Sequence, residues 1–173
     1  IMQADPTPIN GVDLLNTLVG TTFHFKREEI PAEMDALIEK IKNEGEPQEK
    51  RPRILVTGCP MGGATMKVVK AIEENGGRVV AYENCTGAKA IEENVDETNP
   101  DVYDALARKY MNIGCSCMSP NENRIKLLDQ MIDDYKVDAV IDVVLQACHT
   151  YAVETRRINK FVNEEKKIPY MSI

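Results

Sequence analysis

Residues 53–63 read Arg-Ile-Leu-Val-Thr-Gly-Cys-Pro-Met-Gly-Gly, and this stretch decides the fold class. The apolar run 54–57 predicts a short buried strand, and the glycine-rich turn after it leads into a helix that ends at Gly76-Gly77. A second strand is predicted over 78–82. A strand, a helix and a strand in succession are typical of a parallel βαβ unit.

The same alternation continues to the end of the chain. Helices are predicted over 101–110, 121–135 and 151–166, and two further strands start near residues 137 and 168. Such units give a parallel sheet with right-handed crossovers and helices on both faces. We therefore expect an α/β, three-layer, flavodoxin-like domain with a parallel sheet of about four strands.

Residues 1–51 have a different character. Apolar residues recur at helical spacing over 14–19, where Gly20 interrupts them, and again over 28–44, before a polar connection at 46–50. We expect 1–51 to be a helical linker segment from a preceding domain, and 52–173 to be the α/β domain. The chain begins without an initiator methionine and stops in a predicted strand, so we expect a piece of a longer polypeptide.

Composition excludes several function classes. Lys plus Arg number 21 against 28 Asp plus Glu, a formal charge of −7, and no basic block is present, which argues against a nucleic-acid partner. No apolar run approaches the roughly 20 residues of a membrane span. Because the start lacks the pattern of a signal peptide, we expect a cytoplasmic protein with no membrane partner.

The five cysteines are the main candidates for metal binding: Cys59, Cys85, Cys115, Cys117 and Cys148. Three follow predicted strands and two lie just before a helix, so we expect them at the carboxyl edge of the sheet, where ligands bind in such folds. A disulfide framework is disfavoured without export, and zinc lacks a CxxC pair. Thiolates from separated loops suit an iron–sulfur cluster, although buried free thiols remain an alternative.

Three glycines and one histidine complete the candidate site. Gly58, Gly62 and Gly63 could hold a cofactor phosphate at a helix N-terminus, although the turn is neither GxGxxG nor a P-loop. With Glu83 in the place of a ribose-binding acid, a nicotinamide-binding module is an alternative function. His149 follows Cys148 directly, where it could donate to cluster sulfur or act on a substrate.

The cysteine segments together resemble one known family. They are Gly58-Cys59-Pro60-Met61-Gly62-Gly63, residues 82–89 around Cys85, Gly114-Cys115-Ser116-Cys117, and residues 145–151 around Cys148. This set is similar to the 2-hydroxyacyl-CoA dehydratase D-component family, which includes subunits of 2-hydroxyglutaryl-CoA dehydratase and benzoyl-CoA reductase. The fuller cysteine set looks closest to the double-cubane-cluster branch.

The resemblance implies a two-domain protein whose C-terminal half is this chain, with a [4Fe-4S] or double-cubane cluster between the domains. Cys148 matches a segment in which the family supplies a ligand. Cys85, Cys115 and Cys117 match the additional cysteines of the double-cubane branch, whereas Cys59 matches a position that often holds another small residue. Since the N-terminal domain supplies ligands of its own, we expect no intact cluster in this chain alone.

The resemblance also implies an activity. An ATP-hydrolysing iron–sulfur activator protein delivers electrons at low potential, and the full-length protein, as a dimer, acts as a dehydratase on an acyl-CoA or as an ATP-dependent reductase of small molecules. The chain by itself is then inactive. A non-catalytic thiol or metal regulatory domain is the remaining alternative.

Overall fold

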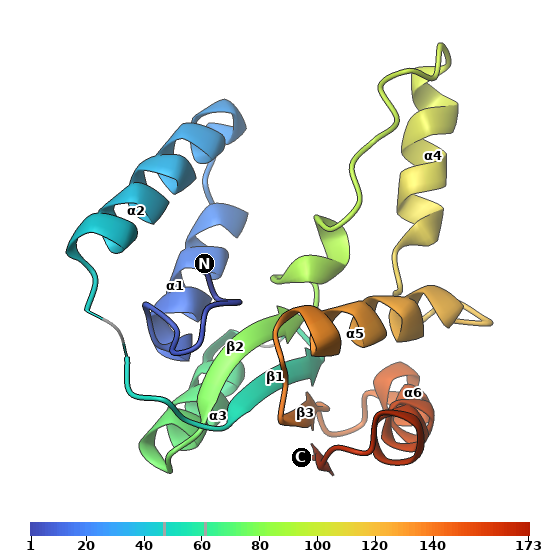
Figure 1. Cartoon of the computed structure of the whole chain (residues 1–173). Coiled ribbons are helices and arrows are strands. Elements are labelled where there is room, and N and C mark those ends of the chain that lie inside the picture. Colours follow the sequence, from blue (N-terminus) through green and yellow to red (C-terminus); the bar gives the residue numbers. More distant parts are fainter. Residues whose placement is uncertain (47, 61) are drawn as a thin grey trace.

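The computed structural model describes residues 1–46, 48–60 and 62–173, so Pro47 of the polar connection and Met61 of the glycine-rich turn lie outside the described residues. Four strands form one sheet in the order β2-β1-β3-β4 (Figure 1). They are β1 (Arg53–Gly58), β2 (Arg78–Glu83), β3 (Ala139–Val143) and β4 (Tyr170–Ser172), and every pairing is parallel. This is the flavodoxin-like strand order, which confirms the expected fold class.

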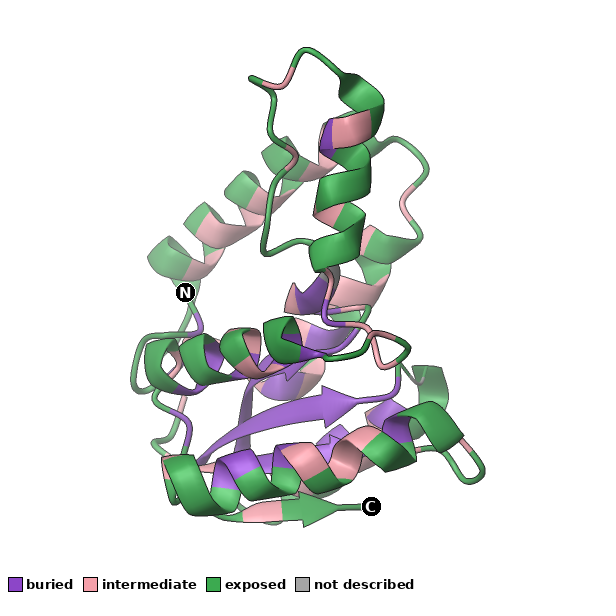
Figure 2. Cartoon of the chain, turned by 90° about the vertical axis from the view of Figure 1, so that its right-hand side faces the viewer, coloured by how far each residue is buried: buried purple, intermediate pink, exposed green. Residues whose placement is uncertain are grey.

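Helices cover both faces of the sheet (Figure 1). On one face, α1 (Gly11–Thr22) and α3 (Gly62–Glu74) enclose a core with the side chains of Leu15, Ile54, Val56, Val69, Val79, Tyr82 and Val143. On the other, α5 (Glu122–Asp134) and α6 (His149–Lys160) enclose a second core, which includes Leu55, Val80, Leu128, Met131, Val140 and Ile158. β1 and β2 are buried at every residue, whereas β4, next to the C-terminus, is mostly exposed (Figure 2).

A β-bulge determines which residues of β2 point toward each of the two cores. Ile54 pairs with Val79 but Leu55 pairs with Ala81, so Val80 is an extra residue in the ladder. As a result, Val80 and Ala81 both pack toward α5 and α6. Tyr82 then returns to the opposite core, where its hydroxyl donates to the carbonyl of Gly11 at 2.7 Å and ties α1 to the sheet.

The first helix is longer than expected. The sequence predicts an interruption at Gly20, but α1 continues to Thr22. The hydroxyls of Thr21 and Thr22 both donate to the carbonyl of Leu18, at 2.8 and 3.0 Å. These bonds satisfy a carbonyl near the helix end and offset the weak helix propensity of glycine and threonine.

Two helices project from the sheet: α2 (Ile30–Glu44), which follows the short turn η1 (Arg27–Glu29), and α4 (Val102–Asn112) (Figures 1 and 2). The loop before α4 contains η2 (Ala88–Ala90), and the π-helical stretch η3 (Phe161–Lys166) follows α6. In the described part of the chain, no helix combines the length and the apolar character needed to cross a bilayer.

Replacing Gly58 by alanine is expected to destabilise the domain. Gly58 has φ 104°, and an added Cβ would overlap the carbonyl oxygen of Val143 on β3. The left-handed backbone and the steric overlap together predict a loss of about 2–5 kcal/mol in urea unfolding. Gly76→Ala is the control, because Gly76 has φ 90° with open space around it and should lose only about 1–2 kcal/mol. Equal losses would mean that the approach of β1 to β3 is not tight.

Candidate functional site

The cysteine-bearing segments meet at the carboxyl edge of the sheet. Cys59 directly follows β1, Cys85 follows β2 in the second position, and Cys148 precedes α6 in the connection from β3. Because all strands are parallel, these connections leave the sheet at the same edge. All five cysteines, including Cys115 and Cys117 in the loop before α5, are free thiols.

Cys59 and Cys148 form one pair of neighbouring thiols. Cys59 is 2% exposed, and its sulfur accepts the backbone N–H of Leu145 at 3.5 Å. Burial raises the pKa of the Cys59 thiol, and the adjacent Cys148 thiol raises it further. The backbone N–H of Tyr151 and the hydroxyl of Thr150 lower the pKa of Cys148. Cys148 is therefore the member of the pair that ionises first.

Cys115 and Cys117 form the second pair. The Cys117 thiol donates to the sulfur of Cys115 at 3.4 Å. The backbone N–H of Cys117 lowers the pKa of Cys115, and both the Cys117 thiol and the Lys89 ammonium lower it further. The pKa of Cys117 is raised by its bond to Cys115. One thiolate per pair is thus favoured, and thiolates are the form of cysteine that binds metals.

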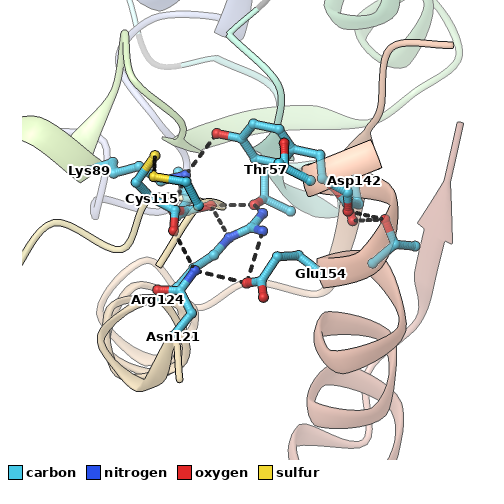
Figure 3. A network of polar contacts seen from close by, with 12 residues as sticks. Thr57, Lys89, Cys115, Asn121, Arg124, Asp142 and Glu154 are labelled. Atoms are coloured by element: carbon cyan, nitrogen blue, oxygen red, sulfur yellow. Dashed lines mark hydrogen bonds and ion pairs between the residues drawn. The ribbon is translucent and has the colours of Figure 1, made fainter. Parts of the chain in front are cut away.

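A buried ionic network lies beneath this edge, centred on Glu83 at the end of β2 (Figure 3). The hydroxyl of Thr57 donates to its carboxylate. The Lys89 ammonium lies 3.1 Å from Oε1, an ion pair without hydrogen-bond alignment, and Nε of Arg124 lies 3.4 Å from Oε2. The side chains of Glu83, Lys89 and Arg124 are all fully buried. Charges buried this deeply are stable only when paired.

The network extends from Arg124 to α6. The Nη2 of Arg124 donates to the hydroxyl of Thr57 at 2.9 Å, and Nη1 of Arg124 lies 3.6 Å from Oε2 of Glu154 on α6 (Figure 3). Asn121 donates to the same Glu154 oxygen and to the carbonyl of Cys115, both at 2.9 Å. Burial opposes the charge of Arg124, but the Glu83 and Asp142 carboxylates raise its pKa above the ordinary value.

Lys89 closes the network by donating to the hydroxyl of Tyr151 at 3.2 Å. Each cysteine-bearing segment thus contributes at least one member. Thr57 precedes Cys59, Lys89 follows Cys85, Arg124 follows the Cys115–Cys117 loop, and Tyr151 follows Cys148. The network therefore fixes the cysteine segments relative to one another.

A second buried acid lies at the end of β3. Asp142 is 1% exposed, and Oδ2 accepts the hydroxyls of Tyr170 at 2.8 Å and Thr155 at 3.2 Å. Burial raises the pKa of Asp142, although the Tyr170 hydrogen bond and the Arg124 charge oppose that rise. Such an acid retains its proton at a higher pH than an exposed aspartate does.

The remaining predicted residues lie around this edge. Gly58 is positioned by its approach to β3, which favours a packing role, whereas Gly62 and Gly63 are exposed at the start of α3 with open space around them. His149 is the first residue of α6 and is exposed. Glu83 is fully buried and paired, so its carboxylate is not available to a ribose hydroxyl.

Sequence reasoning missed the network. Glu154 shows no sign of burial in the sequence, but its side chain is 12% exposed and pairs with Arg124. The indication available was the presence of Glu83 and Asp142 in otherwise apolar strands, because a charged residue in a buried strand requires a partner. Lys89, Arg124 and Asn121 have no comparable local pattern.

The donor set fits an iron–sulfur cluster. Soft thiol groups from several loops lie at one edge of the sheet, where Cys59 neighbours Cys148 and Cys115 neighbours Cys117. The pKa values of Cys115 and Cys148 are lowered, and Cys85 and Cys117 are exposed. Hard, oxygen-preferring ions would require carboxylates, but Glu83 is already bound by buried cations.

The chain is similar to known proteins along almost its whole length. Residues 1–173 match the protein family described as "2-hydroxyglutaryl-CoA dehydratase, D-component". The chain is 55% identical over 174 residues to "Putative dehydratase subunit YjiM" of Escherichia coli (strain K12). The match covers 99% of this chain and 45% of that relative, so the chain spans less than half of the relative's length.

Proposed function

The chain belongs to the 2-hydroxyglutaryl-CoA dehydratase D-component family, and from this premise we propose that it supplies thiolate ligands to an iron–sulfur cluster. The cluster passes electrons at low potential to an acyl-CoA or a small-molecule substrate of the full-length protein. The chain's own role is ligation, burial and hydrogen bonding, which together set the potential of a cluster.

The observation that carries this proposal is the shared edge. Cysteines that lie far apart in the sequence leave the sheet at its carboxyl edge, and one buried network links the segments that bear them. The proposed ligands are Cys85, Cys115, Cys117 and Cys148.

Cys59 has a weaker claim to be a ligand. Its sulfur is buried, accepts a backbone N–H, and has a raised pKa, so it ionises less readily than Cys148. The number of cysteines suits the double-cubane-cluster branch of the family, which we propose as the subgroup.

The proposed partners are a second domain of the same protein, an ATP-hydrolysing iron–sulfur activator and a second copy in a dimer. A large exposed apolar face on α4 supports the first of these: Val102, Tyr103, Tyr110 and Met111 are each at least 64% exposed. An isolated helix of this length is marginal in water, so α4 needs a covering surface. We assign that cover to the second domain, because the relative is more than twice as long as this chain.

Anaerobic purification of the full-length protein, followed by iron and sulfide analysis and EPR, tests the proposal. We expect iron and sulfide in equal amounts and an EPR signal after reduction. Zinc in place of iron would support a regulatory domain instead. Dinucleotide binding without iron would support a nicotinamide module.

A further inference from the structure

Tyr151 holds an unusual position between the two buried cations. It lies in the first turn of α6, three residues after Cys148, and is 7% exposed. The Lys89 ammonium lies 5.1 Å from the centroid of its ring, and the Arg124 guanidinium carbon lies 5.2 Å from it. Lys89 therefore lies beside the hydroxyl and Arg124 against the ring, so both cations of the network contact Tyr151.

The O–H of Tyr151 is a hydrogen-bond donor without an acceptor among the described residues. Its oxygen accepts from Lys89 at 3.2 Å, and because an ammonium group has no lone pair, Lys89 cannot accept in return. Within residues 1–46, 48–60 and 62–173, the O–H of Tyr151 finds no acceptor. A buried tyrosine hydroxyl ordinarily finds a partner.

Two of the cysteine-bearing segments lie next to this donor: Cys148 is three residues before Tyr151, and Lys89, which donates to the hydroxyl, is four residues after Cys85. Burial raises the pKa of Tyr151, and the negative charges of Cys85, Glu83 and Cys115 raise it further. The phenol therefore stays protonated near neutral pH. Lys89 occupies a lone pair of the oxygen and so restricts the directions in which the O–H can point.

We propose that the Tyr151 hydroxyl donates a hydrogen bond to a sulfur atom of the cluster held at this edge. Tyr151 then adjusts the reduction potential of the cluster, and Lys89 is the positioning residue that orients the Tyr151 hydroxyl. This inference rests on the proposed function. Hydrogen bonds to cluster sulfur stabilise the more electron-rich reduced state and thereby raise the reduction potential.

The test compares Tyr151→Phe with Tyr135→Phe in the full-length protein, purified anaerobically. Tyr135 directly follows α5 at the amino edge of the sheet, where its carbonyl accepts Nε of Arg53 on β1, so it controls for the substitution itself away from the cysteines. We expect both variants to match the unmodified protein in iron content and unfolding temperature. Only Tyr151→Phe should shift the midpoint potential to a more negative value, and only it should lose an exchangeable-proton coupling in ENDOR spectra of the reduced protein.

A second substitution makes the opposite prediction. Placing 3-fluorotyrosine at position 151 keeps the ring and makes the hydroxyl a stronger donor, so the midpoint potential should become less negative. An unchanged potential in both variants, or iron loss in Tyr151→Phe, would overturn the inference while leaving the proposed function intact. A full-length protein without iron and sulfide would overturn both.

Discussion

Replacing Cys148 by serine in the full-length protein is expected to remove most of its iron and its activity together. Serine keeps the shape but replaces a soft thiolate by a hydroxyl that stays protonated, so a ligand is lost. The backbone N–H of Tyr151 lowers the pKa of Cys148, which makes it one of the two readiest thiolates at this edge. Substituting a residue that only hydrogen-bonds to a metal ligand already lowers metal affinity or activity about 10–100-fold. The loss of a ligand itself should therefore lower activity at least about tenfold.

Two neighbours serve as controls for this prediction. His149→Ala alters the adjacent residue without removing sulfur, and it should leave the iron content near normal while changing turnover. Cys59→Ser should cost less iron than Cys148→Ser, because the Cys59 thiol is buried and has a raised pKa. Iron and sulfide analysis of the three variants distinguishes a ligand from a neighbouring residue. Equal iron loss in all three would contradict the assigned roles, and unchanged iron in Cys148→Ser would mean that this cysteine is a free thiol and not a ligand.

Replacing Arg124 by methionine should strongly destabilise the chain. The substitution leaves Glu83 with one cation and removes the cationic partner of Glu154. Removing one partner of a buried ion pair costs about 3–5 kcal/mol, because the charge that remains cannot return to water. Urea unfolding followed by circular dichroism measures the loss, as a lower midpoint with an unchanged slope.

Arg156→Met is the matched control, since Arg156 is exposed on α6. Its free energy of unfolding should change by less than about 0.5 kcal/mol. Adding Glu154→Gln to Arg124→Met should recover part of the stability, because the carboxylate that loses its cationic partner becomes neutral while Glu83 keeps Lys89. A loss in Arg124→Met no larger than that of Arg156→Met would show that the network contributes little to stability.

Local patterns in the sequence were enough to predict the fold. Apolar runs of strand length between helical periodicities predict parallel βαβ units, and the glycines after 54–57 mark the turn that follows β1. Such patterns depend only on residues close together in the sequence, so they can be recognised without knowledge of the tertiary structure. The bulge at Val80 was not predicted, because it depends on the register between β1 and β2.

The sequence by itself also determined that the cysteine segments share one edge, since parallel strands end on the same side of a sheet. Only the tertiary structure decided which charges lie beneath them. Thr57 and Arg124 are 67 positions apart, and Lys89 and Tyr151 are 62 apart. A buried hydrogen bond between such distant residues gives no periodic pattern in the sequence, because its stability depends on burial and alignment that exist only after the layers have packed.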